Sequence, residues 1–138
     1  MAHYLFNFLT AEEAGASTLR EQAAVRMRRG LWGIDADERH RAALAPGDLV
    51  LVYVGAPLRS FIGRAELASA AEESTSAGEA GYAVALAEVE AWDPPVPMSA
   101  VLARIPGDTA RGDFEAGVVR ITADEYETAV AVAAERSP

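Results

Sequence analysis

The chemistry open to this sequence comes from arginines, aromatic rings and carboxylates, because other reactive side chains are few. The chain has no cysteine and no lysine, and its only histidines are His3 and His40. Disulfides, thiolate catalysis, cysteine-ligated zinc and Schiff-base chemistry are therefore excluded. His40 could act as a general base, but no serine or cysteine nucleophile stands out near it, so a solvated surface position is the preferred interpretation. We expect no catalytic residue, no metal site and no cofactor.

All twelve basic residues are arginines, for which a GC-rich bacterial coding sequence is the simplest explanation. Guanidinium groups bind phosphates and carboxylates through two parallel hydrogen bonds, so Arg39, Arg41 and Arg64 are candidates for such contacts. The alternative is an exposed arginine paired with a neighbouring acid. That alternative is preferred for Arg39 and has equal weight for Arg64.

The charge balance limits what the chain can bind. The net charge is −9, which argues against a general nucleic-acid binder. The charge is unevenly distributed, because residues 1–64 carry eight arginines against seven acids, whereas residues 65–138 carry four against fourteen. A local basic patch from the first half of the chain stays possible. No apolar run reaches the roughly 20 residues of a membrane helix, and the start does not resemble a signal peptide, so we expect a cytoplasmic protein without membrane contact.

The first half of the chain has clear element signals. Residues 3–8 predict a strand, and a capping box at Thr18 predicts a helix that buries Leu19, Ala23 and Met27 and ends at Gly30. A brief helix is expected over residues 37–44. Residues 49–54 are apolar on both faces, which predicts a central strand. Residues 60–67 should return as its hairpin partner, with Phe61, Gly63, Ala65 and Leu67 on one face.

The second half alternates less regularly. Residues 68–81 are expected to form a mobile loop, and residues 82–92 a strand whose phase slips near Ala87, as at a bulge. The prolines of residues 94–97 exclude a central strand there. A short helix over 98–105, a strand over 117–121 and a helix capped at Thr122 that buries Tyr126, Ala129, Val130 and Ala133 complete the chain. The pattern predicts one domain over residues 1–138 with an α/β (α+β) fold, a small mixed and mostly antiparallel β pseudo-barrel of about five to six strands with flanking helices.

The order of several short motifs resembles the EVE domain family, a PUA-like group related to YTH and ASCH domains. The motifs are Leu31-Trp32-Gly33-Ile34, Arg39-His40-Arg41, the run from Leu44-Ala45-Pro46-Gly47-Asp48 into Tyr53, and Phe61-Ile62-Gly63-Arg64-Ala65-Glu66-Leu67. His3 to Phe6, Pro94 to Met98 and Val118 to Val130 also match the family's opening strand, its proline-rich turn and its closing strand and helix. The resemblance covers nearly the whole chain and implies a PUA-like barrel with a pocket beside the first helix.

The resemblance implies a non-catalytic reader of modified or flipped bases in DNA or RNA. Trp32 would be the stacking wall and Gly33 the point of close backbone approach. The implied ligand-binding residues are Trp32, Gly33, Ile34, Tyr53, Phe61, Arg64 and Phe114, with phosphate contacts from Arg29 and Arg41. For Trp32, a purely structural role in the core has about the same weight. The alternative function is a pocket protein, or a small enzyme, for a planar metabolite or nucleoside, which the acidic balance favours, and a protein-interaction module is a third possibility.

Overall fold

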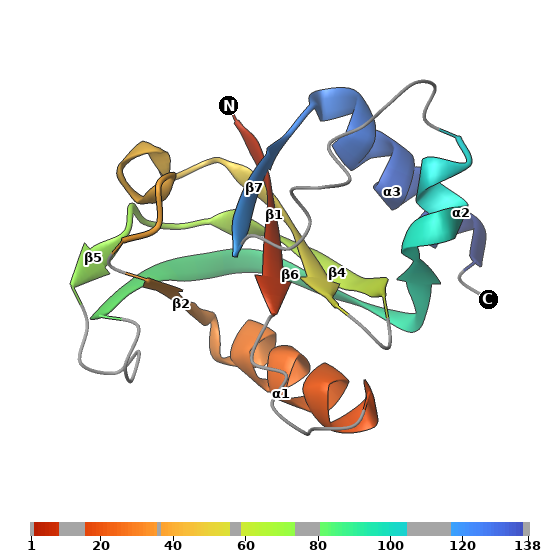
Figure 1. The fold of residues 1–138 in the computed structure, drawn as a ribbon, viewed down its shortest axis with the longest axis horizontal. Helices are drawn as coiled ribbons and strands as arrows, with labels where there is room; N and C mark the ends of the chain where they lie inside the picture. Colours follow the sequence, from red (N-terminus) through yellow and green to blue (C-terminus); the bar gives the residue numbers. More distant parts are fainter. Residues whose placement is uncertain are drawn as a thin grey trace.

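The computed structural model describes residues 2–8, 16–35, 37–55, 59–73, 81–104 and 117–136. Its elements, in chain order, are β1 (His3–Phe8), α1 (Ala16–Arg29), β2 (Leu31–Asp35), a 3-10 turn (Arg41–Ala43), β3 (Leu49–Val54), β4 (Ser60–Leu67), β5 (Glu72–Glu73), β6 (Gly81–Pro97), α2 (Met98–Leu102), β7 (Val118–Ile121) and α3 (Ala123–Arg136) (Figure 1).

The strands form one mixed sheet in the order β2-β6-β4-β3-β1-β7, and the short β5 also pairs with β6. β1 runs parallel to β3, and every other pairing in the described sheet is antiparallel. The sheet curls into a half-barrel flanked by three helices (Figure 1). The predicted α+β fold, a small mixed and mostly antiparallel β pseudo-barrel with flanking helices, is confirmed.

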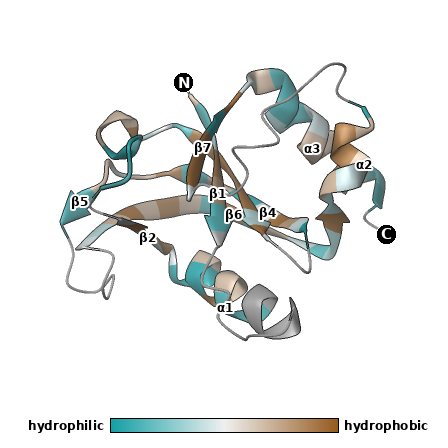
Figure 2. Cartoon of the chain, viewed as in Figure 1, coloured by the Kyte–Doolittle hydropathy of each residue, from teal (hydrophilic) through white to brown (hydrophobic). Residues whose placement is uncertain are grey.

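Two groups of buried side chains lie on opposite faces of this sheet. The inner cluster, on the side of α1, receives residues from both end strands, Trp32 and Ile34 of β2 and Val118 of β7, which is why the sheet must curl around it. The outer cluster lies under α2 and α3 and contains Tyr53 and Phe61. The central strand β3 contributes Val50, Val52 and Val54 to the inner cluster and Leu51 and Tyr53 to the outer cluster, as its two-sided apolar pattern predicts. Figure 2 shows β7 almost entirely hydrophobic and β5 hydrophilic.

A bulge in β4 changes which side chains share a face. Val52 pairs with Gly63 and Tyr53 with Phe61, so Ile62 is an extra residue without a partner in β3. Phe61 consequently lies in the outer cluster, whereas Ala65 and Leu67 lie in the inner one. The prediction that Phe61 shares a face with those residues was wrong, because strict alternation holds only within an unbroken ladder.

The irregularities predicted for β6 are present. Arg64 pairs with Glu90 but Glu66 with Ala87, so β6 has an extra residue next to the predicted phase slip, and Glu88 there has a φ of 48°. The proline segment continues β6 to Pro97, which pairs with Ser60. Since β2 pairs with β6 only from Gly81 to Ala85, no second strand of the described residues lies beside the proline segment, in agreement with the expectation.

The helices differ from the predictions mainly at their ends. α1 begins at Ala16, two residues before the expected cap, and ends where Gly30 takes the left-handed φ of 71°. In place of a helix over residues 37–44 there is only the 3-10 turn, because the Glu38 carboxylate accepts the backbone N–H of Val118 in β7 as well as that of His40, which fixes this segment to β7. β5 lies within the segment predicted as a loop.

α2 ends at Leu102, earlier than expected. The Thr122–Glu125 capping box forms in both directions, with N–H···O distances of 2.8 and 3.1 Å, and α3 buries Tyr126, Ala129 and Ala133 as predicted.

Candidate functional site

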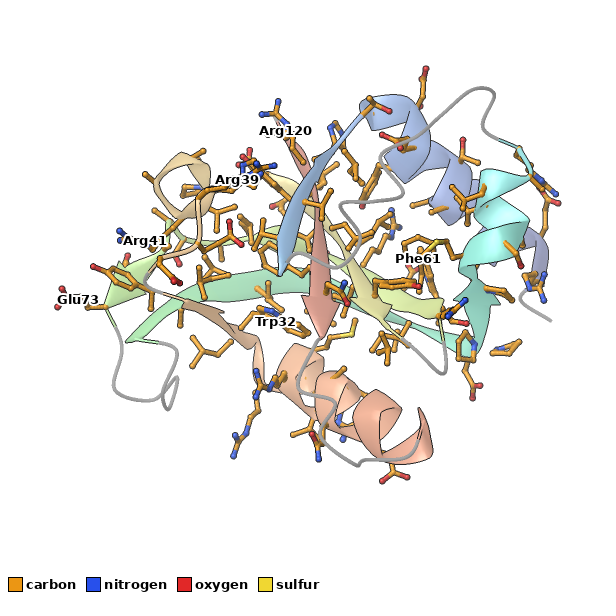
Figure 3. All side chains as sticks on the ribbon, in the orientation of Figure 1. Trp32, Arg39, Arg41, Phe61, Glu73 and Arg120 are labelled. Carbon is orange, nitrogen blue, oxygen red and sulfur yellow. The ribbon has the colours of Figure 1, made fainter. Side chains whose placement is uncertain are left out.

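The residues implied as ligand contacts do not lie together. Trp32 and Ile34 point into the inner cluster, whereas Tyr53 and Phe61 pack against each other in the outer cluster with ring centroids 5.2 Å apart. Arg64 also lies away from Trp32, since its guanidinium pairs with Glu90 on β6. Figure 3 shows Trp32 and Phe61 well separated, with Phe61 close to α2. Phe114 lies outside the described residues. One planar ligand therefore cannot contact Trp32 and Tyr53 at the same time.

Trp32 is fixed by the transition from α1 to β2. Gly30 ends the helix by donating its N–H to the Met27 carbonyl oxygen at 3.0 Å, and its own carbonyl accepts the N–H of Leu86 at 2.8 Å. The chain therefore enters the sheet at once, and Trp32 pairs with Val84. Trp32 is 4% exposed, and its indole packs against Phe6 with the ring centroids 6.0 Å apart. The guanidinium of Arg26 lies 6.0 Å from the indole centroid, so one face of Trp32 is next to an exposed cation.

Glu38 ties the loop after β2 to β7. One carboxylate oxygen accepts the backbone N–H of Val118 at 3.2 Å, and the other accepts that of His40 at 2.8 Å. Since β2 and β7 are the two ends of the described strand order, this carboxylate joins segments that the sheet itself does not connect. Arg39, His40 and Arg41 directly follow Glu38, so the attachment of Glu38 to β7 also holds the loop that carries these three side chains.

The segments joined by Glu38 bring arginines onto aromatic rings at one end of the half-barrel. Arg41 lies over Tyr82 at 4.1 Å, and Arg120 lies 5.6 Å from the ring centroid of Tyr4. We call Arg39, Arg41 and Arg120 the arginine rim (Figure 3). Cation–π contacts of this kind hold a guanidinium in a fixed orientation while leaving its N–H groups able to donate.

The ring of His40 also lies beside Tyr4. The imidazole of His40 lies 6.0 Å from the Tyr4 ring, and its Nε2 accepts a hydrogen bond from Nε of Arg39 at 3.3 Å. Tyr4 itself is 1% exposed. Burial raises the pKa of the Tyr4 hydroxyl, which Arg120 opposes and Asp48 reinforces. The phenol is therefore neutral at physiological pH.

Sequence reasoning missed Tyr4, Glu38, Tyr82 and Arg120 as members of this end of the molecule. Arg120 carried a usable signal, because it is the one charged residue in an otherwise apolar strand and so must face solvent. Arg41 was a predicted phosphate contact and lies in the rim. Arg29, the other predicted phosphate contact, is exposed in the last turn of α1 together with Arg28.

A separate groove of about 350 Å³ runs along the outer face beside α3. Its lining is Leu49, Arg64, Ala65, Glu66, Glu88, Val89, Glu90 and Tyr126. Three carboxylates and one arginine make it acidic, which does not suit a phosphate. Glu90 also accepts a hydrogen bond from the indole Nε1 of Trp92 at 2.8 Å. This hydrogen bond lowers the pKa of Glu90, and the Arg64 guanidinium lowers it further, although partial burial opposes both.

The Trp92–Glu90 hydrogen bond should make Trp92 fluorescence report acidification. Because the pKa of Glu90 is lowered in the folded chain, the bond is fully present above the ordinary glutamate value of 4.5 and is lost only as the pH falls below it. We expect one step in Trp92 emission below that value, measured in a Trp32→Phe background. In Glu90→Gln the step should disappear; a step that persists there would belong to another carboxylate.

Among the described residues, no group of three or more histidines, cysteines and carboxylates could hold a metal ion. In the same part of the chain, no helix is both long enough and apolar enough to cross a membrane.

Comparison with known proteins identifies the fold. No protein-family model and no curated protein sequence matches the chain. Among solved structures, Rpa0253 from Rhodopseudomonas palustris is similar, with a TM-score of 0.69, 20% identity and 100% of this chain covered against 97% of that one. Atu2648 from Agrobacterium tumefaciens has a TM-score of 0.65 and 18% identity over 96% of this chain and 93% of that one.

An ASCH protein from Zymomonas mobilis is also similar, with a TM-score of 0.55 and 13% identity over 94% of both chains. The chain thus shares its overall fold with these proteins, the ASCH protein among them.

Proposed function

We propose that this chain is a non-catalytic domain of the EVE type that binds DNA or RNA and recognises a modified or flipped base. The observation that supports the proposal is the arginine rim, in which guanidinium groups lie on the rings of Tyr4 and Tyr82 at the end of the half-barrel. Arginines contact phosphates, so guanidinium groups held in place on aromatic rings suit the backbone of a single strand or of an extruded nucleotide. The similarity to an ASCH protein agrees with such a role through fold alone.

In this proposal the base binds on the Trp32 side of the sheet. It would replace the Arg26 guanidinium over the indole, while Gly33 permits close approach of the backbone and Ile34 packs beside it. Base–aromatic stacking contributes about 1–3 kcal/mol, which is comparable with the cost of extruding a base that is already weakly paired. Arg29 and Arg41 would contact phosphates on either side. The overall negative charge of the protein repels phosphates and so opposes these arginine contacts. Because added salt weakens the contacts further, binding should be weak at high salt.

A titration with matched oligonucleotides tests the proposal. Short single- and double-stranded DNA and RNA, each with and without one modified cytosine or adenine, would be followed by anisotropy at two salt concentrations. We expect tighter binding of a modified oligomer, a loss of affinity with added salt, and at least about a tenfold loss in Trp32→Ala, from the removed stacking. Trp92→Phe is the matched control, because it changes the other tryptophan on the opposite face. Absence of oligomer binding at low salt would overturn the proposal.

The outer groove supports a second candidate, a site for a planar metabolite or nucleoside. Its volume of about 350 Å³ is in the range of small-molecule sites, and Arg64 and Tyr126 supply a cation and a ring. Tyr53 and Phe61 would then form its supporting wall from beneath. Binding there should be nearly independent of salt for a neutral ligand and should be reduced by Arg64→Gln but not by Trp32→Ala, which separates the two candidates.

A further inference from the structure

We propose that Arg39, His40 and Arg120 form a phosphate site around the ring of Tyr4, in addition to the phosphate contacts assigned to Arg29 and Arg41. The inference rests on the proposed function, since the phosphate would be one of the bound strand. It adds a second anchor, built from three segments that are distant in sequence: β1, the loop after β2, and β7.

The floor of this site is rigid and its cations are accessible. Tyr4, the second residue of β1, is 1% exposed, and the Arg120 guanidinium and the His40 imidazole lie 5.6 and 6.0 Å from its ring centroid. Arg39 and Arg120 are exposed. The guanidiniums of Arg39 and Arg120, together with the imidazole of His40 in its protonated form, match the several acceptor oxygens of a phosphate group.

Among the described residues, neither Arg39 nor Arg120 forms an ion pair with a carboxylate. In the part of the chain that the structure describes, the arginines in ion pairs are Arg64 with Glu90 and Arg104 with Glu135, on the side of α3. The carboxylates closest to the Tyr4 cluster are already committed to the backbone: Glu38 accepts from Val118 and His40, and Asp48 accepts from Ala2 and Ala45 at 3.0 and 3.1 Å. Neither carboxylate forms an ion pair with the guanidinium of Arg39 or Arg120, so both guanidiniums can still donate to an added anion.

The hydrogen bond between Arg39 and His40 makes the site sensitive to protons. Nε2 of His40 can accept from Arg39 only when the imidazole is neutral. A phosphate would attract the Arg39 guanidinium away from His40. Its oxygens would then accept a hydrogen bond from a protonated Nε2–H of His40, so the anion-bound state favours the protonated ring. Among the described residues, Arg39 and Tyr4 contact the imidazole and Glu38 accepts the backbone N–H of His40, while Arg120 and Asp48 lie near Tyr4. Binding should therefore take up a proton and tighten as pH falls through the range in which histidines ionise.

The test uses the full chain and one single-stranded oligomer in two forms, 5′-phosphorylated and 5′-hydroxyl. We expect Arg39→Gln and Arg120→Gln each to weaken binding about tenfold, as for loss of one charge-assisted contact, while Arg104→Gln, an exposed arginine on the other side, has no effect. A preference for the 5′-phosphorylated form that these variants abolish assigns the site to a terminal phosphate. Equal losses for both forms assign it to a phosphate within the strand.

Proton linkage gives an independent readout with the 5′-hydroxyl oligomer, whose phosphodiesters do not titrate between pH 5 and 8. His40→Gln should flatten the pH dependence of affinity, whereas His3→Gln should leave it, because His3 packs on Tyr126 instead. If the wild-type chain binds oligomers but both arginine variants bind like Arg104→Gln, the Tyr4 site is wrong and the proposed function stands. If no oligomer binds and inorganic phosphate leaves the His40 ring resonances unshifted, both are wrong.

Discussion

Replacing Gly63 by alanine is expected to lower the free energy of unfolding by about 3 kcal/mol, at the upper end of the cost of overpacking a core. A Cβ at this position would overlap the backbone carbonyl oxygen of Glu90 and would lie 2.5 Å from Cε of Met27. Met27 could change its rotamer, but the carbonyl belongs to the β4–β6 ladder, where Gly63 pairs with Ala91. Urea unfolding followed by tryptophan fluorescence measures the loss.

Gly55→Ala is the matched control for this prediction. Gly55 directly follows β3, and a Cβ there would meet only Oδ1 of Asn7 at 3.8 Å, an ordinary contact. We expect a change within about 0.5 kcal/mol, because reduced freedom of the unfolded chain offsets small losses. Equal destabilisation by the two substitutions would show that close strand approach is not what requires glycine at position 63.

Replacing Glu38 by alanine is expected to cost about 2–3 kcal/mol, because it leaves the N–H groups of Val118 and His40 without their acceptor. The arginine rim should also lose its arrangement, since the loop that carries Arg39 and Arg41 would no longer be attached to β7. We therefore expect oligomer affinity to fall at least about tenfold in a chain that is still folded, comparable with the removal of a charge-assisted contact.

Amide hydrogen exchange is the most direct measurement for Glu38→Ala. The Val118 and His40 amides should exchange faster, while those in the centre of β3 should change only by the global loss of stability. Glu127→Ala is the control, because Glu127 is an exposed carboxylate on α3. Unchanged protection of Val118 would mean that the carboxylate does not hold β7.

Much of the fold was predictable because it depends on short-range signals. The apolar run of β3, Gly30 after α1 and the Thr122–Glu125 capping box each act within a few residues, and all three form as expected. The bulge at Ile62 was not predictable from alternation, because it depends on how β4 meets β3. The missing helix over residues 37–44 has a similar cause, since Glu38 is bound to an amide 80 residues away.

The candidate site was less predictable than the fold for the same reason. Trp32 and the motif at residues 39–41 could be singled out, but nothing in the sequence relates them to Tyr4 or Arg120, which reach the same end of the molecule only through pairing of β1 with β7. Tyr53 and Phe61 were grouped with Trp32 by resemblance. Their side chains lie on the other face, because Tyr53 follows Val52 in β3 and Phe61 precedes the bulge.

The position of β1 between β3 and β7 has a consequence for how the chain folds. His3 lies opposite both Leu49 and Ile121, so β1 gains one neighbour when β3 has been synthesised and the other only after β7 has been synthesised. Pairings of such long sequence separation slow folding, because the intervening loop must close before any contact repays its entropy. Until β7 arrives, one edge of β1 is an open template for another chain. Pairing of β7 with β1 is therefore the step that closes this strand edge against association with another chain.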